Sequence, residues 1–179
     1  KPDGILSVAY LPRFSLENFK LNKKSIILIL DGIEIPGNIG TMLRVCDGAG
    51  VDAVFICNRK ARLSHPKLIK GSMGAVLTVP IVEFVNVEEC YNYLHKNKFK
   101  IYLADTRAEK NYFEEEYQDR TAFVMGSERY GISREWYNYD CGLISLPMLG
   151  KCDSLNVGVA ATVIIYDATM KIKLGAKHS

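Results

Sequence analysis

The chain has 179 residues, of which 48% are hydrophobic and 24% charged, and its formal net charge is +3. This length and apolar content suffice for one domain with a sizeable core. There is no signal-peptide pattern and no uninterrupted apolar run of about 18 residues. We therefore expect no membrane-spanning segment and predict a cytoplasmic protein.

The cysteines are odd in number and scattered, and no two of them form a Cys-x-x-Cys pair. This pattern favours reduced structural thiols over a disulfide framework, and no metal site is expected. The five are Cys46, Cys57, Cys90, Cys141 and Cys152.

The elements expected in chain order alternate between strands and helices. A polar, turn-rich lead-in (residues 1–24) is interpreted as a linker in a piece of a longer protein, because the chain begins with Lys1 rather than Met; the domain itself is residues 25–179. Hydrophobic periodicity and turn residues then predict both kinds of element. The expected strands are Ile26–Leu30, Ala53–Ile56, Val76–Val82, Lys100–Ala104, Thr121–Met125 and Gly142–Leu146. The expected helices are Asn38–Gly48, a short one at Pro66–Gly71, Val87–Lys98, a short one at Ser133–Tyr139 and a long one at Ser154–Met170. Such alternation predicts an α/β domain, a mostly parallel sheet with helices on both faces.

Positive charge gathers in one stretch, since no Asp or Glu occurs from Ala53 to Val82. An acid-free basic segment suits a polyanion, although a solvated basic loop is an equal alternative at this point. The basic side chains are Arg59, Lys60, Arg62, Lys67 and Lys70, with His65 among them.

The expected final helix is apolar nearly all round, and Gly158, Ala160 and Ala161 keep it thin. One face of a sheet cannot cover such a helix, so we expect a homodimer that forms partly through it; a helix sunk in the core is the alternative.

Three glycine-bearing turns follow predicted strands, where α/β sheets place their ligand loops. They are Asp31–Arg44 (DGIEIPGNIGTMLR), Val124–Ser133 (VMGSERYGIS) and Leu146–Asn156 (LPMLGKCDSLN). None ends in the Gly-Lys-Ser/Thr of a phosphate loop, and none carries Gly-x-Gly-x-x-Gly, so the ordinary nucleotide motifs are absent.

Together the three turns resemble the signature motifs of the SpoU (TrmH-like) branch of the SPOUT superfamily, which are RNA ribose 2'-O-methyltransferases. The resemblance spans Ile26 to about Lys171, and Pro2–Ala9 resembles the segment that joins such a catalytic domain to an N-terminal RNA-binding domain. The matching residues are Asn38 and Arg44 in the first turn, Gly126-Ser127-Glu128 and Gly131 in the second, and Leu146-Pro147-Met148 with Ser154-Leu155-Asn156 in the third.

The resemblance implies a deep C-terminal trefoil knot and S-adenosyl-L-methionine as the cofactor. It implies cofactor contacts from the second and third turns and from Thr106, namely Thr106, Met125, Gly126, Gly131, Leu146, Pro147, Met148, Ser154, Leu155 and Asn156. The implied catalytic set is Arg44, Asn38, Glu128, Ser154 and Asn156, and the implied RNA contacts are Arg44, Arg59, Lys60, Arg62, Lys67 and Lys70.

Each implied role has a plain structural alternative. Arg44 is expected to grip the phosphate beside the target ribose, or else is a surface arginine. Asn38 either orients Arg44 or caps its helix, and Glu128 pairs with Arg44, binds a neighbouring loop or forms a surface ion pair. Ser154 and Asn156 are expected both to cap the final helix and to line the site.

This chain departs from the family pattern at two places. Tyr130 replaces the small residue common in the second motif, and Gly158 replaces a common Ser, which leaves room for close helix packing. The residues alone also leave two rivals open, a catalytically inactive RNA-binding module of the same fold and a nucleotide-dependent oxidoreductase. Whether the RNA is ribosomal or transfer RNA is not decided by the sequence.

Overall fold

The structure is a computed structural model that describes residues 4, 8, 10–12, 14–17 and 19–175. Most of Pro2–Ala9, compared above with an interdomain segment, lies outside the described residues. The strands are β1 (Ser25–Asp31), β2 (Ala53–Cys57), β3 (Ile81–Glu83), β4 (Lys100–Ala104), β5 (Arg120–Gly126) and β6 (Gly142–Ile144). The helices are α1 (Pro36–Ala49), α2 (Pro66–Ser72), α3 (Ala75–Thr78), α4 (Val87–Lys96) and α5 (Val157–Ile172), with 3₁₀ helices η1 (Tyr112–Glu114) and η2 (Arg134–Asn138).

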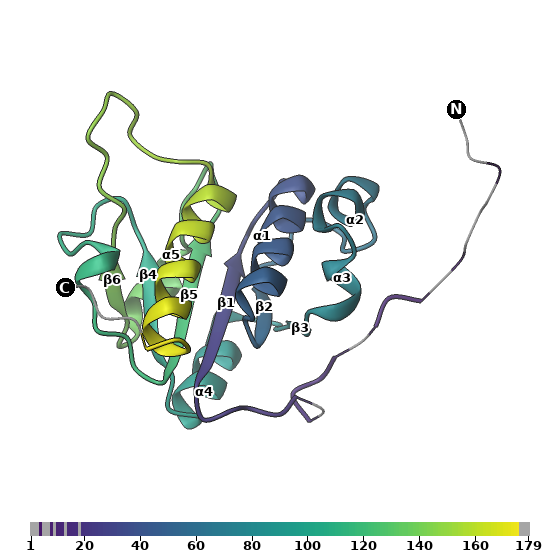
Figure 1. The fold of residues 1–179 in the computed structure, drawn as a ribbon, viewed down its shortest axis with the longest axis horizontal. Coiled ribbons are helices and arrows are strands. Elements are labelled where there is room, and N and C mark those ends of the chain that lie inside the picture. Colours follow the sequence, from purple (N-terminus) through teal and green to yellow (C-terminus); the bar gives the residue numbers. More distant parts are fainter. Residues whose placement is uncertain (1–3, 5–7, 9, 13, 18, 176–179) are drawn as a thin grey trace.

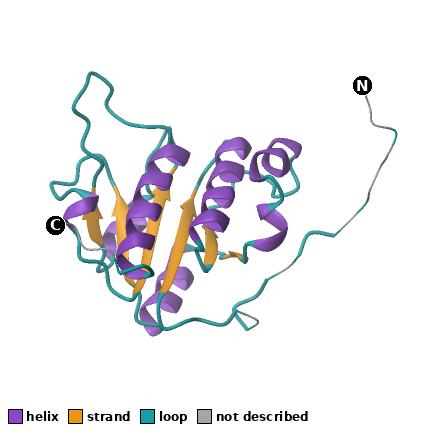
Figure 2. Ribbon diagram, viewed as in Figure 1, coloured by secondary structure: helices purple, strands orange, loops and turns teal. Residues whose placement is uncertain are grey.

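The strands form one sheet in the order β3-β2-β1-β5-β4-β6, and every pair of neighbours is parallel (Figure 2). The predicted α/β class is thereby confirmed. The chain leaves β1 toward β2 and leaves β5 toward β6, in opposite directions across the sheet. The gap between the carboxyl ends of β1 and β5 is therefore a topological switch point, where α/β sheets place ligands.

Alternate residues of the central strands feed two separate cores. Ile26, Leu28 and Leu30 of β1 pack with α1, α2, α3 and α5 on one face of the sheet. Ile27 and Ile29 pack on the other face with α4 and with Trp136 of η2. Because both faces of the sheet are covered, β1 carries apolar residues at each of its five interior positions, 26–30.

One predicted element is wrong. Val76–Val82 is not a strand: α3 occupies 75–78, Pro80 follows, and only 81–83 form β3. Ala75, Val76 and Val79 are buried at helical spacing. A short, mostly apolar run is compatible with a buried strand as well as with a helical turn, so periodicity could not separate the two. The short helix predicted at Ser133–Tyr139 is confirmed as the 3₁₀ helix η2, and the sheet's other strands lie within two residues of their expected bounds.

Helix α5 lies beside α1 on one face of the sheet (Figure 1). A Cβ added at Gly158 would lie 3.3 Å from Thr41 Cγ2, so the glycine permits close packing of the two helices, as expected for this departure from the family pattern. The solvent-facing side of α5 carries an exposed stripe of Val159, Tyr166 and Met170 at helical spacing. The apolar character of α5 is thus only partly explained by its own domain.

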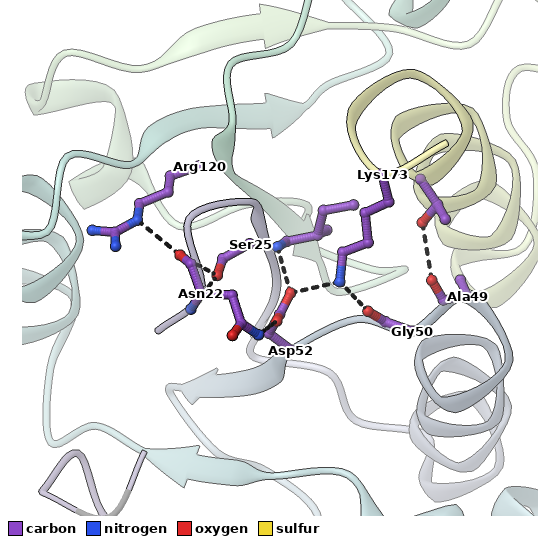
Figure 3. Close-up of polar contacts among 9 residues, drawn as sticks. Asn22, Ser25, Ala49, Gly50, Asp52, Arg120 and Lys173 are labelled. Carbon is purple, nitrogen blue, oxygen red and sulfur yellow. Dashed lines mark hydrogen bonds and ion pairs between the residues drawn. The ribbon is translucent and has the colours of Figure 1, made fainter. Parts of the chain in front are cut away.

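A polar network anchors the far end of α5 (Figure 3). Lys173 Nζ forms an ion pair of 2.8 Å with Asp52 Oδ2 and also donates to the Gly50 carbonyl. Asp52 in turn accepts from the backbone N–H of Ile26 at 2.9 Å and from Asn22 Nδ2 at 2.9 Å. These contacts tie the carboxyl end of α5 to the starts of β1 and β2. The amino end of α5 lies at the other end of the strands, near their carboxyl ends.

The described part of the lead-in contacts the domain. Phe14, Leu16, Phe19 and Leu21 are partly buried against the α4-side core. Across the described ranges no helix is long and apolar enough to cross a membrane. The knot and the division into residues 1–24 and 25–179 stay predictions.

Candidate functional site

A cavity of about 650 Å³ opens at the carboxyl ends of β4, β5 and β6 and reaches the amino end of α5. Its walls come from the segments after those three strands and from the loop before α5, and they include backbone as well as side chains. The lining residues are Ala104, Asp105, Thr106, Arg107, Met125, Gly126, Ser127, Glu128, Tyr130, Gly131, Ile132, Tyr137, Ile144, Ser145, Leu146, Met148, Asp153, Ser154, Leu155, Asn156, Val157 and Ala160.

The residues expected to contact a cofactor converge on this cavity, with one exception. Pro147 is not among the lining residues, although Leu146 and Met148 on either side of it are. The members of the expected set that line the cavity are Thr106, Met125, Gly126, Gly131, Leu146, Met148, Ser154, Leu155 and Asn156.

The turn after β5 is closed on itself. Ser127 and Gly131 exchange two backbone hydrogen bonds of 3.0 and 2.9 Å, and Gly131 has a φ of +69°. A Cβ at Gly126 would lie 2.2 Å from the backbone carbon of Gly131 and from Ile132 N. The family resemblance implied that Gly126 and Gly131 contact the cofactor. At Gly126 the need for glycine comes from the chain's own backbone, which crosses directly over it.

Three polar side chains from three turns meet beside the cavity. Asn38 Nδ2 donates a short hydrogen bond to Glu128 Oε1, and Asn156 Nδ2 donates to Asn38 Oδ1 at 3.2 Å. The partner of Glu128 is therefore a side chain in the first turn of α1, rather than Arg44, a loop or a surface ion pair. Residues separated by 90 and 118 positions in the sequence are thereby held in one hydrogen-bonded chain, hereafter the Asn38–Glu128–Asn156 trio.

Two expected helix caps are wrong, and one is confirmed. Helix α1 starts at Pro36 with Ile35 as its N-cap, so Asn38 lies inside the first turn and does not cap it. Helix α5 starts at Val157, where Asn156 Oδ1 accepts from Gly158 N at 2.9 Å and is the cap. Ser154 lies two residues earlier, in the loop, and is exposed at the cavity wall.

Arg44 is not part of the trio. It is exposed on α1, six residues beyond Asn38, which is about 9 Å along the helix axis and roughly 120° around it. Within the described ranges its side chain forms no hydrogen bond or ion pair, and Arg44 does not line the cavity. The expected pairing of Glu128 with Arg44 and the expected orientation of Arg44 by Asn38 are therefore absent from the single chain.

The basic stretch follows the carboxyl end of β2 and continues into α2, where Lys67 and Lys70 lie. Arg59 pairs with Glu83 at 3.3 Å, which leaves it partly neutralised. The other expected RNA contacts, Lys60, Arg62, Lys67 and Lys70, are exposed and have no acidic partner in the part of the chain that the structure describes. Arg59 and Arg62 also border a second cavity of about 1110 Å³ beside the lead-in segment.

Sequence reasoning missed a charged cluster at the wall of the cavity. Arg107 Nε and Nη2 donate to the two carboxyl oxygens of Asp105 at 3.0 and 2.8 Å, and Tyr137 Oη donates a short hydrogen bond to Asp105 Oδ2. Arg107 and the phenol hold the pKa of Asp105 well below its ordinary value, while burial together with the Asp105 charge raises the pKa of Tyr137 to about 12. The signal was available, because Asp105 and Arg107 follow β4 directly, as Thr106 does.

Sequence reasoning also missed the structural role of Asp31, which it treated only as part of the first turn. Only 2% of Asp31 is exposed, and its carboxylate accepts from Asn58 Nδ2 and from the backbone N–H of Ser133, both at 2.7 Å. The end of β1 thus holds both the start of the basic stretch and the segment that follows the Gly131 turn. Among the described residues no group of three or more His, Cys, Asp or Glu is placed to hold a metal ion, and the five cysteines are free thiols.

Comparison with known proteins shows where this architecture recurs. Residues 25–166 match the sequence profile described as the SpoU rRNA Methylase family. A TrmH family tRNA/rRNA methyltransferase of Staphylococcus epidermidis is 32% identical over 163 residues, which cover 91% of this chain and 66% of that protein. The 23S rRNA (guanosine-2'-O-)-methyltransferase RlmB of Xanthomonas axonopodis pv. citri is 33% identical over 153 residues, covering 86% of this chain and 61% of the relative.

Solved structures agree with the fold. A crystal structure described as an RNA 2'-O ribose methyltransferase superposes with a TM-score of 0.80 at 29% identity, covering 91% of this chain and 62% of that one. The SpoU methyltransferase AviRb of Streptomyces viridochromogenes, in complex with AdoMet, has a TM-score of 0.85 at 23% identity over 93% of this chain and 64% of that one, a likeness of fold. The chain therefore spans about two thirds of the length of these relatives.

Proposed function

The chain belongs to the SpoU rRNA Methylase family, and on that premise we propose that it is an S-adenosylmethionine-dependent RNA methyltransferase acting on a ribose 2'-hydroxyl of ribosomal or transfer RNA. The observation that carries the proposal is the Asn38–Glu128–Asn156 trio at the wall of a backbone-lined cavity. The names of two relatives, a guanosine-2'-O-methyltransferase and an RNA 2'-O ribose methyltransferase, support the ribose hydroxyl as the acceptor.

The cavity suits the proposed cofactor in chemistry and in size. Apolar side chains such as Leu146 and Leu155 lie beside backbone polar groups of the turn after β5, a mixture that fits the flat face and polar edge of an adenine. Ser154 and Glu128 supply polar groups at the same wall. When bound, S-adenosylmethionine supplies an electrophilic methyl group on a sulfonium.

Positioning is the main task left to the protein in such a transfer. A ribose hydroxyl must be held in line with the methyl carbon, and holding two reactants in that geometry supplies much of a barrier reduction. We assign this to the trio, whose hydrogen bonds fix three side chains from separate turns. We assign RNA phosphate binding to Arg44 and to the basic stretch, because a guanidinium that stays protonated binds phosphate and is poorly suited to removing a proton.

A homodimer formed through the exposed stripe of α5 is part of the proposal. Thr41 and Gly48, one helical turn on either side of Arg44, lie against Gly158 and Tyr166 of α5. Arg44 thus shares a surface with the stripe, and a partner docked there would lie next to its guanidinium. The proposed location is the cytoplasm, where RNA and S-adenosylmethionine are both present.

Calorimetric titration with S-adenosylmethionine and S-adenosylhomocysteine tests the cofactor site. Asn156→Asp keeps the oxygen that caps α5 but removes the donor to Asn38, so we expect about tenfold weaker cofactor binding from a folded protein. Asn86→Asp makes the same change at the N-cap of α4, where Asn86 Oδ1 accepts from Glu89 N at 2.8 Å, and is the matched control. A folded wild-type chain that binds neither compound would contradict the proposal and favour an inactive RNA-binding module.

The acceptor atom is tested separately. Ribosomal and transfer RNA are incubated with the protein and tritiated cofactor. The RNA is then digested to nucleosides, which are separated by chromatography and identified by mass spectrometry. Label in 2'-O-methylnucleosides is the expected result, and label confined to methylated bases would contradict the ribose assignment.

A further inference from the structure

Tyr130 places a large aromatic ring in water at the wall of the cavity. Its exposed fraction is 70%, and it lines the cavity beside Glu128 of the trio. Burial of this ring therefore contributes little to the fold. Its position at the site, in place of a small residue, needs another explanation.

The backbone beneath the ring is rigidly tied. Tyr130 N donates to Ser127 Oγ at 3.0 Å, inside the turn that Ser127 and Gly131 close with their two backbone hydrogen bonds. A ring on a tied backbone loses little conformational freedom when a ligand packs on it. The turn therefore presents the ring ready to bind.

A positive charge accompanies the ring. The guanidinium carbon of Arg129 lies 5.1 Å from the centroid of the Tyr130 ring, within cation–π range. One face of the Tyr130 ring thus contacts a cation. Among the described residues no other aromatic ring packs on Tyr130. Arg107 lines the same cavity but is held in its ion pair with Asp105, so Arg129 is the cation that accompanies the ring.

We propose that Tyr130, supported by Arg129, is a stacking platform for an unpaired base of the substrate RNA, and so a residue that determines which RNA segment can enter the site. Every nucleobase offers a flat π-face, and bases are recognised by aromatic side chains when they are unstacked, as in single strands and loops. A cation beside the ring suits the phosphates that flank such a base. The inference rests on the proposed function, since it takes RNA to be the substrate of this cavity.

The test uses a single-stranded oligoadenylate RNA with 2-aminopurine at its centre, whose fluorescence falls when the base stacks on a ring. Tyr130→Ala is expected to weaken binding about fivefold to a hundredfold and to remove the quenching. Tyr130→Phe keeps the π-face and is expected to retain both. Phe113→Ala removes another exposed aromatic that does not line the cavity and serves as the matched control.

Binding of S-adenosylhomocysteine separates the outcomes. Unchanged cofactor affinity in Tyr130→Ala, with weakened RNA binding, supports the platform. Weakened cofactor affinity with unchanged RNA binding would overturn it, because the ring would then hold the cofactor, and equal RNA binding by wild type and Tyr130→Ala would overturn it as well. A wild-type chain that quenches the RNA through Tyr130 but binds no cofactor would refute the methyltransferase proposal while leaving the platform intact.

Discussion

The carboxylate of Asp31 accepts a hydrogen bond of 2.7 Å from the backbone N–H of Ser133, across 102 positions of sequence. Asp31 ends β1 and lies opposite Gly126 in the sheet register, so this bond holds the segment after the Gly131 turn against the neighbouring strand. A second bond of 2.7 Å, from Asn58 Nδ2, holds the start of the basic stretch to the same carboxylate. One buried side chain thereby links the cavity wall to the proposed RNA-binding segment.

Replacing Asp31 should destabilise the fold. Asp31→Ala leaves the Ser133 N–H without its acceptor at a partly buried position, which costs about 1–3 kcal/mol in the free energy of unfolding. Urea denaturation measures this difference. Asp140→Ala is the control, because the Asp140 side chain is 88% exposed in its pair with Lys100, and it should change stability by less than about 0.5 kcal/mol. Equal stability of wild type and Asp31→Ala would show that the bond contributes nothing.

Gly126→Ala should disrupt the site more than it disrupts the sheet. The new methyl group would lie 2.2 Å from the backbone of Gly131 and Ile132, neither of which is a flexible side-chain end. We expect a loss of at least about 2 kcal/mol of stability and loss of cofactor binding, because the turn must move away from β5. Thermal unfolding and calorimetry measure the two effects. Gly37→Ala, which has open space around its Cβ position, should leave both nearly unchanged.

The Asp105 cluster makes stability depend on pH in acid. The pKa of Asp105 is lowered in the folded protein, first of all by its hydrogen bonds with Arg107, so its carboxylate favours folding above the unfolded value near 3.9. The difference in unfolding free energy between wild type and Asp105→Asn should therefore be present at pH 6 and shrink as the pH falls below about 4. Because Arg107 is exposed, added salt should reduce it. A difference that is constant from pH 6 to pH 2 would contradict this account.

NMR titration of the Asp105 carboxyl offers a direct check. Arg107→Ala should raise its pKa toward the ordinary value more than Tyr137→Phe does, because the guanidinium is the larger cause of the shift.

The proposed dimer depends on the α5 stripe. Tyr166→Glu puts a charge into that stripe, where burial against a partner would cost several kcal/mol, so sedimentation velocity should show monomer. Val85→Glu introduces the same charge at another exposed apolar residue, in the loop before α4, and should leave the dimer intact. A wild-type chain that sediments as a monomer at all concentrations would contradict the proposal.

Binding of transfer RNA should depend on salt through the basic stretch. Removing one cation that binds a phosphate lowers the slope of log K against log salt concentration by about 0.7–0.9. Lys67→Ala should show such a decrease, whereas Lys96→Ala, on α4 across the sheet, should not. Arg59→Ala should have the smaller effect of the two stretch variants, because Glu83 already neutralises Arg59 in part. An unchanged slope in Lys67→Ala would favour a merely solvated loop.

The sequence pattern correctly predicted the elements whose secondary structure depends on interactions between residues that are close in sequence. The buried run 25–31, the helix that Gly50 ends in a left-handed conformation and the strand 100–104 follow from hydrophobic periodicity and capping chemistry. The three turns were found because the carboxyl ends of parallel strands meet at one edge of the sheet, so turns distant in sequence were expected to share a site. Local signals failed at 76–82, because a short, mostly apolar run is compatible with a helical turn and with a buried strand.

Only the tertiary structure decided which hydrogen-bond partners the polar side chains have. Asn38 could cap its helix or bind elsewhere, and the choice depended on Glu128 and Asn156 arriving from turns 90 and 118 residues away. Asp31 and Asp105 looked like ordinary turn carboxylates until burial and long-range donors distinguished them. Apart from 76–82, the sequence by itself determined which segments are strands, helices and ligand turns, because periodicity, capping and turn chemistry act over a few residues. The packing of the sheet determined which of their polar atoms meet, because hydrogen bonds are directional and short-ranged, and no sequence spacing specifies a distance across a fold.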